Sequence, residues 1–456
     1  MPMMFSRSSI GILGVAVAFS MTASQAQDLG AVTTPGAHIQ RTMKLLADST
    51  PEKRNRVRVL FYGQSITCQS WWRAVAKELK ERFPAADLDI KNRAIGGFTA
   101  PNLIATTEYD LFPFYPDLLI FHVYGSAKMD KWEEIIRLAR TRTATEILLW
   151  THHDAGRKRD YPQSERIREI AVKYDCGLVD VEAQWQKVLA EKGLEPKAFL
   201  SDSVHLNKEG CALLASMITP FLVRTSKLMT DQSRGLAEDI SMDDASVKVR
   251  GDGSVELAFT GNRIDAIALP GVGTDGLAAV TIDGKSSAEI DGTFALTRPS
   301  NAPYTWFPAV KVIKNNAPLV AEKWTLEFLE FTPDASEFTY RATGSVTGED
   351  GEGSKDKPFV SKSGRVVIDG GANWHRVPWS LTYKKKKMPE TFSVNWRVYP
   401  MFVDELRFPA VKNAASERAV TLVQGLPNGP HTLRLIPHKG TKLDLRGFRV
   451  YHPALP

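Results

Sequence analysis

The hydrophobic pattern of the chain changes near residue 228, from strands that alternate with helices to short strands alone. In the first part, runs with the length and composition of buried strands occupy residues 57–62, 88–91, 118–123, 147–150 and 177–181. Apolar residues at helical spacing occupy residues 69–83, 102–111, 131–142, 164–174, 183–191 and 208–226. This alternation predicts an α/β domain over residues 56–228, with a parallel five-stranded sheet covered by helices on both faces.

The second part of the chain has a different pattern of hydrophobic residues. Residues 229–244 are predicted to form a linker, and short alternating runs then fill residues 245–456. Turn sequences such as Asp283-Gly284 and Asn428-Gly429 separate these runs. We therefore predict a β-rich domain here, with the architecture of a β-sandwich or jelly roll.

The first 26 residues have the composition of a signal peptide. Arg7 precedes an apolar run over residues 10–19, and Ser24-Gln25-Ala26 suits cleavage after Ala26. We expect export to a bacterial periplasm or beyond, with residues 27–55 as a surface lead-in that carries one short helix. No later apolar run is long enough for a spanning helix, so no integral membrane segment is expected after removal of the signal.

Composition narrows the class of partner. The formal net charge is +6, which favours an acidic partner, although a generically basic secreted protein explains it equally well. Export argues against nucleic acid and leaves anionic glycans or a membrane surface. The three cysteines, Cys68, Cys176 and Cys211, lack the spacing of a metal site, and we expect buried thiols, no metal and no cofactor.

Residues capable of chemistry follow the predicted strands. Ser65 comes after the first strand, Gly96 and Gly97 after the second, and His152 and His153 after the fourth. The carboxyl ends of parallel strands share one edge of the sheet, which is where ligands bind in such folds. A loop after the fifth strand contributes Asp202 and His205, and a histidine three residues after an aspartate can contact both that carboxylate and a serine. The alternative for Ser65, Asp202 and His205 is a role in turns and helix caps, although Asn207 fits the cap of the last helix better.

The order of these motifs resembles that of the SGNH/GDSL hydrolases over residues 57–225. Gly63-Gln64-Ser65-Ile66 resembles the first block of the family, with Gln64 in place of the usual aspartate. Residues 92–99 resemble the second block, and residues 202–207 resemble the last block, DxxH. The resemblance implies a flavodoxin-like three-layer domain with Ser65 as nucleophile, His205 as base and Asp202 as its orienting acid. It also implies an oxyanion hole formed by the backbone N–H groups of Ser65 and Gly97.

One block departs from the family pattern. Residues 116–125 match the approach to the GxND block, but Ala127 occupies the position of the asparagine that completes the oxyanion hole. Loss of such a donor costs on the order of 100- to 1000-fold in rate. Ser126, Lys128 and Asn92 are the nearby candidates for a replacement donor.

The resemblance and the appended β-rich domain favour an esterase that removes acetyl groups from a polysaccharide or oligosaccharide, which could be anionic. The residues that we expect to contact the substrate are Gln64, Arg93, Tyr124, His152 and His153. Two alternatives remain open. The first is a uronate lyase or glycosidase on the same scaffold, motivated by Ala127, the histidines and the basic loop at residues 157–159. The second is a non-catalytic glycan-binding protein.

Overall fold

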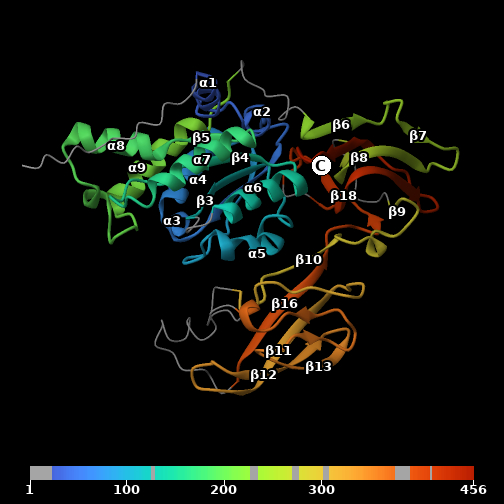
Figure 1. The fold of residues 1–456 in the computed structure, drawn as a ribbon. Helices are drawn as coiled ribbons and strands as arrows, with labels where there is room; N and C mark the ends of the chain where they lie inside the picture. The colour runs from blue at the N-terminus through green and yellow to red at the C-terminus, as the bar shows by residue number, and fades with distance from the viewer. Residues whose placement is uncertain are drawn as a thin grey trace, which may run out of the picture.

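The computed structural model describes residues 23–124, 129–225, 235–269, 277–300, 308–374, 391–410 and 413–456 (Figure 1). The α/β domain contains a parallel sheet in the order β2-β1-β3-β4-β5. Its strands are β1 (Arg56–Gly63), β2 (Asp87–Asn92), β3 (Leu118–His122), β4 (Glu146–Trp150) and β5 (Gly177–Val179). The predicted parallel five-stranded sheet is confirmed.

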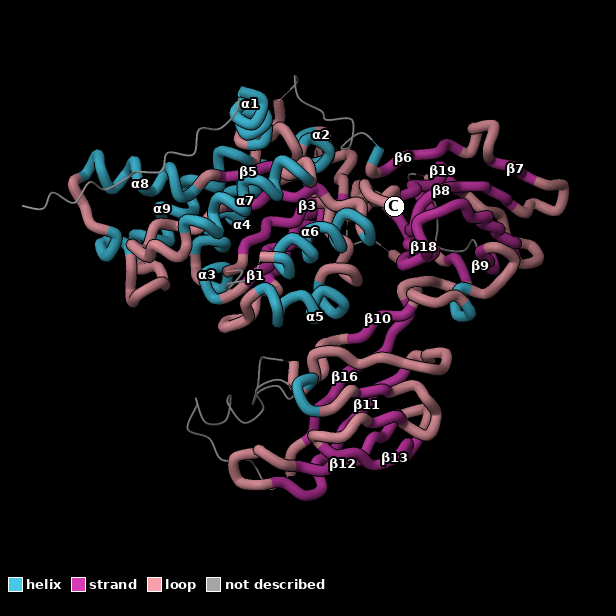
Figure 2. Tube along the Cα trace, in the orientation of Figure 1, coloured by secondary structure: helices cyan, strands magenta, loops and turns pink. Residues whose placement is uncertain are grey.

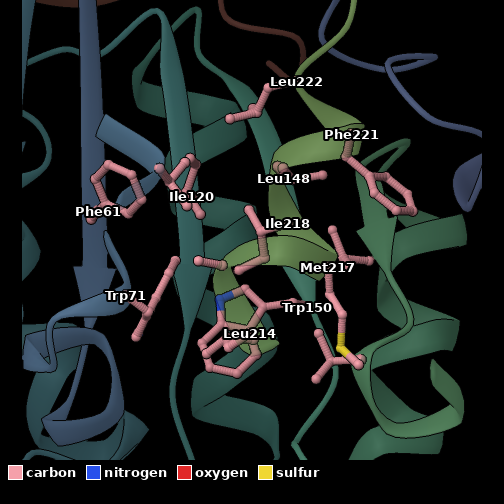
Figure 3. Packing of buried hydrophobic residues seen from close by; sticks show 14 of the residues in the cluster. Phe61, Trp71, Ile120, Leu148, Trp150, Leu214, Met217, Ile218, Phe221 and Leu222 are labelled. Atoms are coloured by element: carbon pink, nitrogen blue, oxygen red, sulfur yellow. The ribbon is translucent and has the colours of Figure 1, made fainter. Parts of the chain in front are cut away.

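Helices cover both faces of this sheet because alternate residues of each strand point to opposite sides. Phe61 and Leu148 pack with Trp71 in the core beneath α4, α8 and α9, which Figure 3 shows from close by. Leu60 and Leu149 belong to the second core, beneath α5, α6 and α7. The helices are α4 (Trp71–Arg82), α5 (Ala100–Asp110), α6 (Asp130–Arg142), α7 (Tyr161–Lys173), α8 (Val181–Lys192) and α9 (Lys208–Ile218).

Two predicted boundaries differ from the structure for local reasons. The strand expected to reach residue 181 ends at Val179, because the Asp180 side chain accepts a hydrogen bond from the N–H of Ala183 and caps α8. The helix expected to reach residue 226 ends at Ile218. Pro220 lacks the N–H that would continue the helix, and a short 3₁₀ turn, Thr219–Phe221, follows.

The β-rich region consists of two antiparallel sheets with separate hydrophobic cores. The larger sheet is built from β6 (Ala237–Ser241), β7 (Val247–Val249), β8 (Val255–Ala268), β9 (Ala278–Ile282), β17 (Glu405–Leu406), β18 (Ala419–Pro437) and β19 (Leu445–Tyr451). The smaller sheet is built from β10 (Phe294–Leu296), β11 (Glu322–Phe331), β12 (Phe338–Gly344), β13 (Gly348–Ser354) and β16 (Ser393–Pro400). A separate pair is formed by β14 (Phe359–Val360) and β15 (Val367–Ile368). A second, largely antiparallel β region is therefore confirmed. Because β10 to β16 lie between β9 and β17 in the chain, the smaller sheet is an insertion into the larger one (Figure 2).

The amino-terminal part of the chain contains α1 (Ala23–Val32) and α2 (Gln40–Ala47), which pack on opposite faces of the parallel sheet. Residues 1–22 lie outside the described residues, so export stays a prediction. Within the described ranges, no helix has both the length and the apolar character that crossing a bilayer requires.

Strand β6 occupies part of the predicted linker, because it pairs with β19 at the edge of the larger sheet. Cys176 and Cys211 are buried thiols as expected, but Cys68 is exposed at the end of a short helix.

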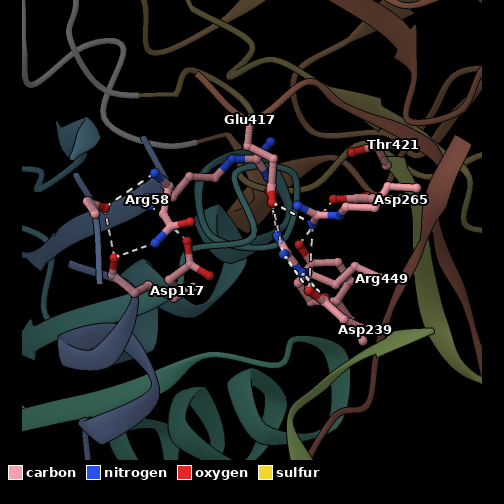
Figure 4. A network of polar contacts seen from close by, with 12 residues as sticks. Arg58, Asp117, Asp239, Asp265, Glu417, Thr421 and Arg449 are labelled. Atoms are coloured by element: carbon pink, nitrogen blue, oxygen red, sulfur yellow. Dashed lines mark hydrogen bonds and ion pairs between the residues drawn. The ribbon is translucent and has the colours of Figure 1, made fainter. Parts of the chain in front are cut away.

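The larger β sheet docks against the amino edge of the parallel sheet through buried polar groups (Figure 4). Arg263 and Asp265 form a bidentate ion pair in which both side chains are at most 5% exposed. Arg263 also lies over the ring of Tyr115, which precedes β3, and the Tyr115 hydroxyl donates to Asn262 at 2.7 Å. Gln424 donates to the carbonyl oxygen of Phe112 at 2.9 Å. These contacts fix the two domains to each other at the edge where Asp117 enters β3.

We predict that Asp265→Ala destabilises the protein by about 3–5 kcal/mol, because it leaves the Arg263 guanidinium buried without its counter-charge. Urea unfolding followed by tryptophan fluorescence measures the change. The matched control is Asp239→Ala. Asp239 is 55% exposed, and its partner Arg449 keeps Glu417, so the expected loss is below about 1 kcal/mol. Equal losses in the two variants would contradict this account of the interface.

Candidate active site

The position of Ser65 depends on the glycine that ends β1. Gly63 has φ +154°, and a Cβ built on it would lie 1.9 Å from the carbonyl oxygen of His122 in β3. Only glycine allows this close approach of the two strand ends. The chain then leaves the sheet at Gln64, and Ser65 begins the short helix α3 (Ser65–Cys68), partly exposed at the carboxyl edge of the sheet.

A loop from the far end of the domain brings Asp202 and His205 to the same edge. Oδ2 of Asp202 lies 2.7 Å from Nδ1 of His205. The other carboxylate oxygen accepts the backbone N–H groups of Val204 and His205, at 2.8 and 2.7 Å. These hydrogen bonds, with that from the His205 ring, lower the pKa of Asp202 to about 2. The carboxylate is therefore ionised at neutral pH and holds the Nδ1 proton of the imidazole.

Two polar side chains fix this loop to the rest of the site. Gln69, four residues after Ser65, donates to the carbonyl oxygen of Leu206 at 2.8 Å and accepts its N–H at 3.1 Å. His153 donates from Nε2 to the carbonyl oxygen of Val204 at 2.9 Å. The residues on both sides of His205 are thus bonded to the nucleophile segment and to the end of β4.

Ser65 and His205 share this edge, but they are not hydrogen-bonded to each other. Within the described ranges, neither the Ser65 hydroxyl nor Nε2 of His205 has a hydrogen-bond partner. The expected Ser65–His205 hydrogen bond is therefore not formed in this structure, and the catalytic triad stays a prediction. Catalytic hydrogen bonds are often long without substrate and tighten in the complex.

The turn after β2 lies beside Ser65. The N–H of Ile95 donates to the carbonyl oxygen of Gly63 at 2.9 Å, and a Cβ built on Gly96 would lie 4.0 Å from the Cβ of Ser65. Gly97 has φ +79°, which the turn requires and which glycine adopts without strain. Among the described residues, the backbone N–H groups of Ser65 and Gly97 have no acceptor. They are therefore available to hold an oxyanion.

Asn92, one of the three candidate replacement donors, is occupied. Its amide donates to the carbonyl oxygen of Thr67 at 2.7 Å, and its side-chain oxygen accepts the N–H of Ala94 at 2.9 Å. It joins the end of β2 to helix α3. Ser126, Ala127 and Lys128 lie outside the described residues.

The histidines at the ends of β3 and β4 are buried and neutral. His152 and His153 are at most 1% exposed, and burial lowers the pKa of His152 to about 3 and that of His153 to about 4. Nδ1 of His152 lies 2.6 Å from Nε2 of His122, and its Nε2 lies 3.4 Å from Gln163. His122 stacks on Trp150, and burial lowers its pKa well below the usual value. Substrate contact by either His152 or His153 stays a prediction.

A cavity of about 670 Å³ lies beside these residues. It is lined by Gln64, Thr99, Tyr124, Met129, Arg157, Arg159, Asp160, Pro162, Gln163 and Val204. Since Gln64 precedes Ser65 and Val204 precedes His205, the cavity adjoins the predicted nucleophile and base. Gln64 and Tyr124, both expected to contact substrate, are brought together here.

Arg93 lies elsewhere, at the contact with the inserted sheet. Its carbonyl oxygen accepts a hydrogen bond from Arg298 at 2.5 Å, and Arg298 also pairs with the buried Asp110 at 2.7 Å. The Arg93 side chain is exposed and does not line the cavity.

In the described part of the chain, no three His, Cys, Asp or Glu side chains gather as potential metal ligands.

Sequence reasoning missed Gln69 and His122. Gln69 sits in what reads as the first turn of an amphipathic helix, and nothing local indicates that its amide contacts a loop 137 residues away. His122 could have been noticed as a polar residue in an otherwise apolar strand, a pattern that predicts a buried polar contact.

When the chain is compared with known proteins, similar ones are found only among solved structures. No protein-family model matches the sequence, and no curated protein matches it. A two-domain esterase active on acetylated mannans, crystallised with mannopentaose, is similar over 93% of this chain and 98% of its own, with 15% identity and a TM-score of 0.37.

Two shorter structures are similar to the α/β domain. An acetylxylan esterase from Geobacillus stearothermophilus covers 39% of this chain and 100% of its own, with 21% identity and a TM-score of 0.33. A protein described as a GDSL-like lipase, from Parabacteroides merdae, is similar over 38% of this chain and 98% of its own. The identity is 18% and the TM-score is 0.34.

We predict that Gln69→Leu lowers kcat on an aryl acetate by about 10- to 100-fold, because the loop that carries His205 loses two hydrogen bonds to the nucleophile segment. KM should change little. The control is Gln186→Leu, which removes one hydrogen bond to Asp154 from the exposed side of α8. Steady-state kinetics give kcat and KM for both variants. An unchanged kcat in Gln69→Leu would contradict the positioning role of Gln69.

The pKa values predict a simple pH dependence for the same assay. Asp202 is ionised above about pH 2, and burial keeps His152 and His153 neutral above about pH 4. Burial also lowers the pKa of His122 well below its usual value. Between pH 5 and 8, none of these groups is therefore expected to change charge. A reaction that depends on one general base should then show log kcat/KM rising with pH at a slope of one before it levels off. A slope approaching two would contradict the neutral state of the buried histidines.

Proposed function

We propose that the protein is an esterase that hydrolyses acetyl esters on a glycan, with Ser65 as nucleophile, His205 as general base and acid, and Asp202 as the residue that orients His205. One observation carries the proposal. A loop that Gln69 binds to the segment of Ser65 holds an ionised carboxylate on Nδ1 of His205, and Nε2 has no partner among the described residues. That arrangement suits a base whose second nitrogen removes a proton from a serine hydroxyl.

In the acylation step, Nε2 of His205 takes the hydroxyl proton while the Ser65 oxygen attacks the acetyl carbonyl carbon. The negative charge that develops on the carbonyl oxygen lies against the N–H groups of Ser65 and Gly97. The tetrahedral intermediate collapses, the bond to the sugar oxygen breaks, and His205 returns the proton to that oxygen. The sugar alcohol leaves, and an acetyl group remains on Ser65.

Deacylation repeats the sequence with water. His205 takes a proton from a water molecule, the hydroxide attacks the acetyl-serine carbonyl, and the same N–H groups hold the oxyanion. Breakage of the bond to Ser65 releases acetate, and His205 returns the proton to the serine oxygen. The Asp202 carboxylate stabilises the imidazolium in both steps, because its low pKa keeps it ionised.

The buried histidines argue against the lyase alternative. A lyase needs a base that contacts the sugar, whereas His152 and His153 are buried, and each is bonded to neighbouring groups through at least one ring nitrogen. Burial also holds their pKa values at about 3 and 4, which makes them weak bases. The predicted signal peptide supports action outside the cytoplasm.

The test is acetate release from a panel of acetylated polysaccharides by the wild-type protein and by Ser65→Ala. We expect the variant to lose at least about 1000-fold in kcat/KM while its thermal unfolding is unchanged. Ser70→Ala removes an exposed hydroxyl five residues further on and serves as the control. Absorbance from unsaturated sugar ends is followed in the same samples. Chain cleavage that persists in Ser65→Ala would overturn the esterase assignment.

A further inference from the structure

Two buried polar atoms beside the catalytic residues lack partners. The side-chain oxygen of Gln64 and the hydroxyl of Tyr124 have no hydrogen-bond partner among the described residues, and each residue is 8% exposed. Both side chains line the cavity of about 670 Å³ next to Ser65 and His205. Unpaired buried polar atoms are rare in folded proteins, because they have lost water without gaining a replacement bond.

The surroundings of Tyr124 keep its hydroxyl in place. The Arg157 guanidinium lies 4.8 Å from the ring centroid, and the His152 ring lies 4.2 Å from it. Arg157 is itself held by Asp160, at 2.7 Å from Nε to the carboxylate, and His152 is held by His122. The ring therefore contacts two groups that are themselves held in place. Burial raises the pKa of Tyr124, so its hydroxyl stays protonated and can donate as well as accept.

We propose that this cavity binds the sugar ring that carries the ester, and that Gln64 and Tyr124 recognise free hydroxyl groups next to the acetylated position. The Gln64 oxygen accepts from one sugar hydroxyl, and the Tyr124 hydroxyl exchanges a hydrogen bond with another. The preferred substrate is therefore an acetylated sugar with free neighbouring hydroxyls. A lipid acyl chain in the same cavity would leave both polar atoms unpaired, which disfavours it. The inference rests on the proposed esterase function only in that the bound sugar carries the scissile ester.

The substitution Tyr124→Phe removes the unpaired hydroxyl and keeps the ring. If the hydroxyl serves ligand recognition, its loss should leave the unfolding temperature unchanged or higher. At the same time, kcat/KM should fall at least about tenfold more for mono-O-acetyl methyl glycosides of glucose, mannose, xylose and galactose than for p-nitrophenyl acetate. A purely structural role would lower stability and affect all these substrates alike.

Tyr340→Phe is the matched control. Tyr340 is another buried tyrosine whose hydroxyl has no partner within the described ranges, but it lies in β12 of the inserted sheet. Its substitution should change stability in the same direction as Tyr124→Phe and leave the ratio of the two activities unchanged. Gln64→Leu tests the second polar atom and should reproduce the selective loss on the sugar esters.

The hydroxyl requirement has a direct chemical test. The wild-type protein should prefer the mono-O-acetyl glycosides over analogues whose neighbouring hydroxyls are methylated, and Tyr124→Phe and Gln64→Leu should reduce that preference. Equal selectivity in the wild-type protein and both variants would overturn the inference while leaving the esterase intact.

Binding separates this inference from the proposed reaction. Saturation-transfer NMR with the unacetylated methyl glycosides reports on the cavity without any catalytic step. Binding that is weakened in Tyr124→Phe and Gln64→Leu supports the sugar site even if wild-type protein releases no acetate, in which case the proposed function alone fails. Binding that is absent from the wild-type protein, or equal in all three proteins, overturns the sugar site.

Discussion

The close approach of Gly63 to the His122 carbonyl is the constraint on which the site depends. It brings the ends of β1 and β3 closer than any side chain at position 63 would allow. Ser65 leaves the sheet directly after this contact, and β3 continues into Tyr124 at the wall of the cavity. A substitution at Gly63 would therefore displace both Ser65 and the cavity. Backbone sterics at this one residue thus set the relative positions of Ser65 and the cavity wall.

The two edges of the parallel sheet serve different purposes. The amino edge is occupied by buried charges, with Asp117 accepting the N–H of Arg58 and the side chain of Arg41, and it docks the larger β sheet. The carboxyl edge stays free for Ser65 and the loop of His205. The inserted sheet is held near this second edge by Arg298. Domain packing and chemistry therefore do not compete for the same backbone groups.

Periodicity was enough to predict the sheet, because buried parallel strands have continuous apolar runs and their helices have one apolar face. The common edge of Ser65, Asp202 and His205 followed from the same topology. Gln69 and the partners of His152 could not be predicted, since their contacts join segments that are distant in sequence and depend on side-chain direction. The insertion of one β sheet into another was missed for a related reason. Short alternating strands show which residues face a core but not which strands share that core.

Burial assigns different roles to histidines on one edge of the domain. His122, His152 and His153 have lost contact with water, so the charged form is disfavoured and they act as neutral hydrogen-bonding groups. His205 is partly exposed, and its Nδ1 lies against the ionised carboxylate of Asp202. The same side chain is thus buried and neutral in three positions and partly exposed beside an ionised carboxylate in one. An unpaired hydroxyl such as that of Tyr124 costs about 1–3 kcal/mol of stability. At Tyr124 this cost falls at the wall of the cavity beside Ser65 and His205, where a hydrogen bond to a bound ligand would remove it.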